Sequence, residues 1–244
     1  MKNIFFVILA FSLSGASFAA APSHSSWSTL LKKNVSVKGR VNYKGFISDS
    51  TALNNYLRLL SNNAPQTSWS QNEKMAFWIN AYNAFTVKLV TVYYPVKSIK
   101  DIGGKIQIPF VNTPWDIKFI KIGDDVLDLN KIEHEQLRKT YGDPRVHFAL
   151  VCASKSCPIL LNTAYTAENL DEQLDQQARV FLSDKTRNDV TENKPKLSKL
   201  FDWYAMDFKT KERSVVDFIN IYAPVQISPD AKLTYFVYDW NLNE

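Results

Sequence analysis

The chain has 244 residues, of which 45% are hydrophobic and only 7 are glycine, and its formal net charge at pH 7 is +5. This apolar content excludes intrinsic disorder, and the low glycine count argues against a turn-rich all-β fold. Lysine and arginine are scattered along the sequence rather than gathered in a stripe, so no nucleic-acid partner is expected. The mild positive charge instead suits an anionic periplasmic or cell-surface setting.

The first residues have the pattern of a secretory signal peptide. Lys2 gives a short basic start, the apolar run from Ile4 to Leu13 is too short to span a membrane, and small residues follow at the spacing that a signal peptidase accepts. We therefore expect a signal peptide at 1–20 and a single globular domain at 21–244. The mature protein is expected to be periplasmic or secreted, with no membrane insertion, because no second run of spanning length follows.

Two helices are predicted in the first part of the mature chain. The first covers about Asp49 to Leu60. The second begins at Ser70, which forms a capping box with Glu73, and it ends before Pro95. This second helix is apolar almost all round, so we expect it to be buried on most sides.

The few polar side chains of that second helix are candidate site residues. Glu73 and Asn80 point almost the same way on a helix, and Asn83 lies less than one turn further along. Buried amides and carboxylates must find partners, so these groups either bond loop backbone from inside the core or line a site. We expect all three to lie against residues 145–158, where arginine and histidine offer complementary groups.

The middle of the chain alternates between strand and helix signals. Residues 115–122 alternate apolar and polar side chains, which predicts a strand. A turn at Gly123, a short strand and a helix from about Asn130 follow, and Gly142 ends that helix.

The rest of the chain combines short strands with helices. A strand is predicted over 145–151, with His147 on one of its faces. Thr166 and Ser214 each open a further helix, and 233–238 forms a final strand. Because helices and strands do not alternate regularly, the expected fold class is α+β: a single domain with a mainly antiparallel sheet packed with several helices, one of them buried.

Five sequence blocks together resemble the domain-of-unknown-function family 547: AFWINAYNA, LNKIEHEQLR, DPRVHFALVCASKSCP, FDWYAMDF and YDWNLN. The resemblance covers about 73–243. The activity of this family is unassigned, so the resemblance implies a set of signature residues rather than a reaction. In this sequence they are Glu73, Trp78, Asn80, Asn83, Glu133, His134, Arg138, Asp143, Arg145, His147, Cys152, Ser156, Cys157 and Pro158.

The segment RVHFALVCASKSCPIL holds both cysteines of the chain and admits more than one chemistry. An exported protein with an even number of cysteines usually oxidises them, which predicts a Cys152–Cys157 disulfide in a non-catalytic periplasmic binding or structural module. If the pair is instead reduced, Cys157 precedes Pro158, a favoured first helical residue, and a helix N-terminus stabilises a thiolate.

The reduced form leads to the hypothesis of a Cys-His thiol-dependent hydrolase or acyl transferase that acts on peptide or amide bonds. Cys157 is then the nucleophile and His147 its base, and the imidazole is oriented by Asn80, Asn83, Glu73 or Glu133. Cys152 ends the predicted strand and is expected to be the more buried, structural or resolving sulfur. The binding or supporting residues are Asn83, Glu133, His134, Arg138, Arg145, Cys152 and Ser156. The substrate or partner would be a peptide, amide or glycan of the cell envelope.

Two further interpretations remain open. A metal-dependent site would use His134, His147 and one or both cysteines, but no HExxH or CxxC spacing is present, and no metal or other cofactor is expected. Alternatively, the polar signature residues form one satisfied internal network that specifies the fold. The protein would then bind envelope peptides or glycans through aromatic surface such as Tyr93-Tyr94 or Trp203-Tyr204.

Overall fold

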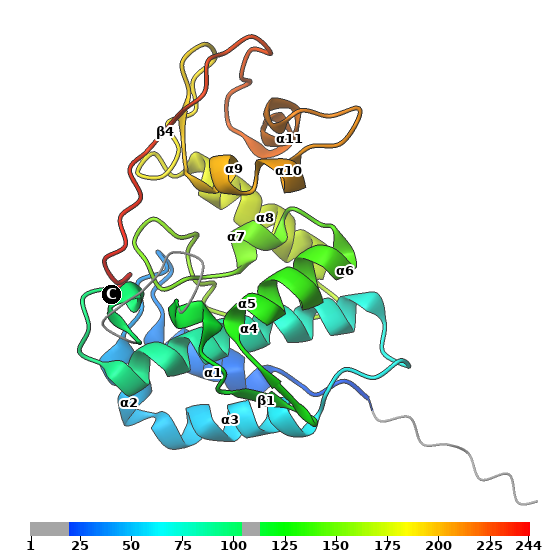
Figure 1. Cartoon of the computed structure of the whole chain (residues 1–244), viewed down its shortest axis with the longest axis vertical. Helices are drawn as coiled ribbons and strands as arrows, with labels where there is room; N and C mark the ends of the chain where they lie inside the picture. The colour runs from blue at the N-terminus through cyan, green and yellow to red at the C-terminus, as the bar shows by residue number, and fades with distance from the viewer. Residues whose placement is uncertain (1–19, 104–112) are drawn as a thin grey trace, which may run out of the picture.

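Residues 20–103 and 113–244 are described by the computed structural model, in which helices predominate (Figure 1). The predicted signal peptide lies almost entirely outside these described residues. No helix within the described ranges is both long and apolar enough to cross a membrane.

Three helices form the lower part of the molecule in Figure 1: α1 (Ser25–Asn34), α2 (Tyr43–Ser48) and α3 (Ser50–Asn62). They pack on one another and on the long helix α4 (Gln71–Tyr93). The helix predicted from Asp49 is confirmed as α3. The apolar stripes of these helices meet in a shared core, in which Trp27 of α1 stacks on Tyr56 of α3 with ring centroids 5.4 Å apart.

Helix α4 is the buried helix that the sequence predicts. Its capping box is confirmed, because the Ser70 amide donates to Glu73 Oε2 at 2.7 Å and the Glu73 amide donates to Ser70 Oγ at 3.2 Å. Every residue from Met75 to Val87 is buried. Any polar side chain in this stretch must therefore find its partners within the protein.

A hairpin and a helical segment follow α4. Strand β1 (Ile120–Ile122) pairs antiparallel with β2 (Asp125–Leu127) around Gly123, whose φ of 59° suits glycine. The helix predicted from about residue 130 is confirmed, and Gly142, with a φ of 61°, ends it as predicted. This helix consists of α5 (Leu129–Lys131), a π-helical stretch η3 (Ile132–Arg138) and α6 (Lys139–Tyr141). Two single 3-10 turns lie before the hairpin in the chain: η1 (Ile99–Asp101) and η2 (Pro114–Asp116).

The predicted strand over 145–151 is wrong. Val146–Ala149 form the short helix α7, and the chain becomes extended only from Leu150. A turn at Asp143 starts this helix, because the Val146 amide donates to the Asp143 carbonyl at 3.2 Å. All residues from Val146 to Leu150 are buried, and a short run of this kind fits a buried helix as well as a strand.

The C-terminal half is a second helical cluster. Ser214 caps its last helix as predicted, whereas the helix expected at Thr166 begins at Leu170. Phe148 of α7 lies in the aromatic core of this cluster. The elements are α8 (Leu170–Ser183), α9 (Leu200–Trp203), α10 (Ala205–Phe208), α11 (Val215–Tyr222), β3 (Lys196–Leu197) and β4 (Thr234–Tyr235).

The predicted α+β architecture is confirmed only in part. Helices occur together with a small antiparallel pair, but the mainly antiparallel sheet is wrong for the described residues. Their named strands form two separate pairs, β1 with β2 antiparallel and β3 with β4 parallel. Several segments that run extended pair only through isolated bridges, such as Ser154 with Leu242.

Candidate functional site

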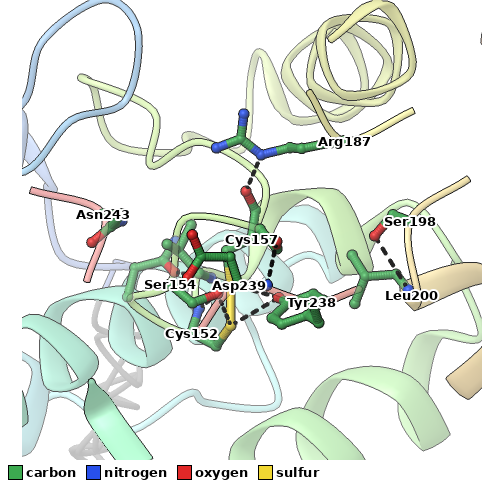
Figure 2. Close-up of a disulfide and its surroundings, with 12 residues drawn as sticks. Cys152, Ser154, Cys157, Arg187, Ser198, Leu200, Tyr238, Asp239 and Asn243 are labelled. Atoms are coloured by element: carbon green, nitrogen blue, oxygen red, sulfur yellow. Dashed lines mark hydrogen bonds between the residues drawn. A yellow bond between two sulfur atoms is a disulfide. The ribbon is translucent and has the colours of Figure 1, made fainter. Parts of the chain in front are cut away.

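Cys152 and Cys157 form a disulfide with their Cα atoms 6.1 Å apart (Figure 2). The chain turns at Ala153, which has a φ of 59°, and the Cys157 amide donates to the Ser154 carbonyl at 3.1 Å. Cys157 is 2% exposed, whereas Cys152 is half-buried. The expectation that Cys152 is the more buried sulfur is wrong, because the turn folds its second cysteine inward.

The helix start expected to activate Cys157 is absent from this described region. Residues 158–169 contain no helix, so Pro158 opens none. The sulfur is bonded to Cys152, and there is no free cysteine in the described part of the chain. The thiolate-stabilising environment on which the nucleophile hypothesis depends is therefore missing around Cys157.

The disulfide loop holds the C-terminal segment in place. The Lys155 amide donates to the Asn241 carbonyl at 2.8 Å, and Ser156 Oγ accepts the Asp239 amide at 2.8 Å. The Tyr238 hydroxyl lies 3.3 Å from each sulfur (Figure 2). Burial raises the pKa of Tyr238 to about 12, so the hydroxyl stays protonated at neutral pH. Ser156, predicted as a site residue, thus bonds backbone.

His147 faces a carboxylate rather than a cysteine. Its Nε2 donates to Asp207 Oδ2 at 2.7 Å, and its ring stacks on Tyr204 with centroids 4.0 Å apart. Asp207 also accepts two hydrogen bonds from Arg138, at 2.6 and 2.9 Å. Burial raises the pKa of Asp207, but the hydrogen bonds from His147 and Arg138 outweigh it and hold that pKa well below its usual range.

The same network extends to Glu133. This buried carboxylate accepts from the Tyr204 hydroxyl at 2.8 Å and from the Tyr82 hydroxyl at 3.3 Å. The Arg138 guanidinium lies 4.7 Å from the centre of the Tyr204 ring and donates to His134 Nδ1 at 2.7 Å. Every buried polar group in this network therefore has a partner.

Helices η3 and α7 thus bring four predicted site residues together: Glu133, His134, Arg138 and His147. Two members of the network, Tyr82 and Asp207, are not among the predicted residues, although they stand in the blocks AFWINAYNA and FDWYAMDF. Tyr204 is predicted as aromatic binding surface, but it bonds Glu133 and stacks on His147 instead.

The amides of α4 anchor two loops from inside the core. Asn83 Nδ2 donates to the Ala149 carbonyl and its Oδ1 accepts the Val151 amide, both at 2.9 Å. Asn80 bonds both backbone groups of Tyr165 in the same manner, at 2.8 and 3.0 Å. The interpretation that these amides bond loop backbone is confirmed. Only Asn83 lies against residues 145–158 as expected.

The proposed orienting roles of Glu73 and Asn80 are wrong for this arrangement. Glu73 caps the first turn of α4, and its hydrogen bonds to Ser70 hold its pKa below the usual value. Asn80 is engaged with Tyr165 and not with His147. Neither group is free to orient an imidazole.

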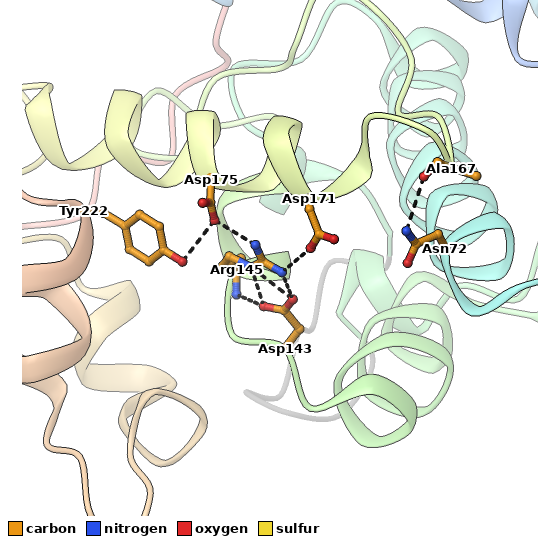
Figure 3. Close-up of polar contacts among 7 residues, drawn as sticks. All are labelled: Asn72, Asp143, Arg145, Ala167, Asp171, Asp175 and Tyr222. Carbon is orange, nitrogen blue, oxygen red and sulfur yellow. Dashed lines mark hydrogen bonds and ion pairs between the residues drawn. The ribbon is translucent and has the colours of Figure 1, made fainter.

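Arg145 ties α7 to α8 and does not contact α4. Its guanidinium bonds Asp143, Asp171 and Asp175, with N–O distances of 2.6 to 2.8 Å for the closest contacts (Figure 3). The Tyr222 hydroxyl donates to the same Asp175 oxygen at 3.1 Å. This arginine therefore holds the start of α7 in place against the α8 helix.

The metal hypothesis finds no ligand cluster in the structure. Within residues 20–103 and 113–244, no group of three or more His, Cys, Asp or Glu side chains is arranged to hold a metal ion. His134 and His147 bond opposite ends of the Arg138–Asp207 pair instead.

Four aromatic side chains from three segments meet beside the disulfide, and we call them the aromatic cluster: Trp115, Trp203, Tyr238 and Trp240. Trp240 contacts all three others, with centroid distances of 4.6 Å to Tyr238, 5.7 Å to Trp115 and 6.0 Å to Trp203. Lys100 Nζ lies 5.0 Å from the Trp240 ring. Trp203 is 48% exposed, so the cluster reaches the surface directly next to the buried Tyr204 network.

Fold and site together define a mainly helical protein with one disulfide, a buried tyrosine–carboxylate–histidine network and an aromatic cluster at the surface. Residues 66–182 match the family model described as "Protein of unknown function, DUF547", which supports the assignment of this segment to that family. The resemblance drawn from the sequence blocks is confirmed, although FDWYAMDF and YDWNLN lie beyond the matched residues. No curated protein and no solved structure matches the chain.

Proposed function

We propose that the protein is an exported, non-catalytic module that binds a glycan of the cell envelope through the aromatic cluster. The observation that carries the proposal is the gathering of Trp115, Trp203, Tyr238 and Trp240 at one surface position. Large aromatic side chains are on average highly buried, so a tryptophan that is 48% exposed at the edge of three other rings needs a reason.

Aromatic rings suit a sugar ligand. The negative face of the ring attracts the C–H groups on the apolar face of a pyranose, and a rigid ring loses little conformational entropy on binding. Exposed polar side chains at the rim, such as Lys100 and Asn241, supply hydrogen bonds to sugar hydroxyls. The cluster is held in place by the disulfide loop, which bonds the backbone of Asp239 and Asn241.

The disulfide supports the non-catalytic form of the proposal. A hydrolase or acyl transferase with Cys157 as nucleophile needs a free thiol and a nearby base. Here the sulfur is bonded and His147 contacts Asp207 instead. The Glu133–Tyr204–His147–Asp207 network then acts as internal structure beneath the binding surface.

Trp203→Ala is expected to weaken glycan binding by about tenfold or more, because a tryptophan in an interface contributes well over 1 kcal/mol. The probes are purified peptidoglycan sacculi in a sedimentation assay and soluble N-acetylglucosamine oligomers followed by tryptophan fluorescence. The matched control is Met206→Ala, since Met206 is 78% exposed on the neighbouring helix α10 and lies outside the cluster. Unchanged affinity of the Trp203 variant, or no binding by the wild type, contradicts the proposal.

Protein isolated from the periplasm is expected to begin near Ala20 and to carry an oxidised cysteine pair. N-terminal sequencing tests the first expectation, and an intact Met1 would overturn it. Iodoacetamide should label neither Cys152 nor Cys157 until a reductant is added. Reduction should then lower the free energy of unfolding by about 2 kcal/mol, because the closed loop is short, and the protein should melt at a lower temperature. Rapid labelling of Cys157 without reductant, slowed by His147→Ala, would instead support the thiol enzyme.

A further inference from the structure

The positive charge of the protein is concentrated at one corner. Residues 21–50 contain five basic side chains and one acidic one, a net charge of +4, whereas residues 51–244 contain 23 of each sign. Lysines and arginines occur along the whole sequence, but the excess of positive over negative charge therefore lies almost entirely in this one segment. We call this region the basic corner; its cations are Lys32, Lys33, Lys38, Arg40 and Lys44, all exposed.

The basic corner is built on a rigid backbone. A hairpin joins α1 to α2, with Val35 bridged to Val41 and the Ser36 amide donating to the Arg40 carbonyl at 3.0 Å. Gly39 turns the hairpin with a φ of 74° and packs so closely on Ile159 that a Cβ atom would lie 2.3 Å from it. The cations are thus presented in a fixed arrangement.

Apolar side chains project among these charges. Val37 at the hairpin tip is 82% exposed, and Ile47 of α2 is exposed as well. The end of α4 adjoins the same corner, because the Tyr94 ring lies 6.3 Å from Tyr43 of α2, and it exposes Tyr93. The basic corner therefore combines exposed cations with exposed apolar side chains.

Few acidic groups oppose the corner. Asp49 pairs with Lys33 at 2.7 Å. Glu244 is engaged with Tyr94, which donates to its Oε2 at 3.0 Å, and its backbone oxygen accepts from Arg40 at 3.1 Å. Among the described residues, neither Lys38 nor Lys44 forms an ion pair. An open hollow of about 470 Å³ has room for a lipid headgroup; its lining includes Arg40, Lys44 and Tyr94 and also the acidic residue Glu244.

We propose that the basic corner docks the protein on the surface of an anionic phospholipid bilayer. The lysines and arginine would contact lipid phosphates, while Val37 and Tyr93 enter the headgroup region. A nucleic acid would also attract the cations, but it offers no apolar layer for Val37, which favours the bilayer. The inference does not depend on glycan binding, since the aromatic cluster comprises other residues.

Sedimentation with vesicles tests the docking. The mature chain should bind vesicles that contain phosphatidylglycerol and should not bind vesicles of phosphatidylcholine alone. High salt should release the bound protein, because counterions screen surface charge. Lys38→Glu with Lys44→Glu should weaken this binding at least about tenfold. Val37→Ser should weaken it without changing the charge of the corner.

The matched control reverses the same number of charges elsewhere. Lys209 and Lys211 are exposed near α10, at the opposite end of the molecule in Figure 1, so Lys209→Glu with Lys211→Glu should bind vesicles like the wild type. Equal loss in this control would show that only net charge matters and would overturn the proposal. The proposal also fails if the wild-type protein does not bind anionic vesicles, or if a DNA duplex binds the protein more tightly and displaces the vesicles. Melting temperatures of all variants verify folding.

Discussion

Replacing Asp207 by alanine is expected to lower the free energy of unfolding by about 2–4 kcal/mol, because hydrogen bonds to charged groups are strong and the partners left behind lie in or near the core. The change removes the acceptor of buried His147 and two of the three acceptors of the Arg138 side chain, which keeps only His134. Urea unfolding followed by tryptophan fluorescence measures the loss. If Asp207→Ala unfolds like the wild type, the network does not hold η3, α7 and α10 together.

The matched control is Asp202→Ala on the neighbouring helix α9. Asp202 pairs with Lys199 at 2.8 Å, but both side chains are exposed, so its removal should cost less than about 1 kcal/mol. The two aspartates differ in burial and partners rather than in chemistry. A similar cost for both would mean that the ion pairs of this region are interchangeable surface contacts.

The pH dependence of stability tests the role of Asp207 in a second way. The folded-state pKa of Asp207 lies well below its ordinary value, so the native state favours the ionised carboxylate. Its stabilisation is complete above the unfolded-state pKa of about 3.9 and is lost as pH falls through lower values. The difference in stability between wild type and Asp207→Asn should therefore be constant near neutral pH and shrink below about pH 4.

Local signals in the sequence predicted the helix ends well. The Ser70–Glu73 capping box, the left-handed Gly142 and the Ser214 cap each depend on residues within one turn of one another, so the sequence alone contains the whole interaction. The burial of α4 was equally predictable, since a helix that is apolar on every side has no face for solvent.

Tertiary pairings were not predictable in the same way. His147 and Asp207 are separated by 60 residues, and their contact requires α7 to be a helix rather than the predicted strand. The signature residues include Glu133, Arg138 and His147, which are partners of Asp207 or Tyr204, but they include neither Asp207 nor Tyr204. In the sequence, Asp207 and Tyr204 each stand as one polar residue in an aromatic block. The cysteine spacing correctly allowed a disulfide, yet which sulfur is buried depends on the turn at Ala153.

The Asn83 side chain is expected to make a large contribution to stability. Asn83→Ala should cost about 2–4 kcal/mol, because the Ala149 carbonyl and the Val151 amide both lose their buried partner. Asn83→Asp should cost more, since a carboxylate oxygen would face the Ala149 carbonyl inside the core. The control Asn72→Ala lies on the same helix, but its side chain is exposed and makes one bond of 3.3 Å, so its effect should be small.

The Asn83 variant should also loosen the disulfide loop directly, beyond the faster reduction that any general loss of stability would cause. Val151 directly precedes Cys152, so its amide bond to Asn83 fixes the entry to the disulfide loop. Under native conditions dithiothreitol should reduce the pair faster in Asn83→Ala than in Asn80→Ala, because Asn80 bonds Tyr165 beyond the loop. Equal reduction rates in the two variants, at equal stability, would show that Asn83 supports the core generally and does not hold the cysteine segment.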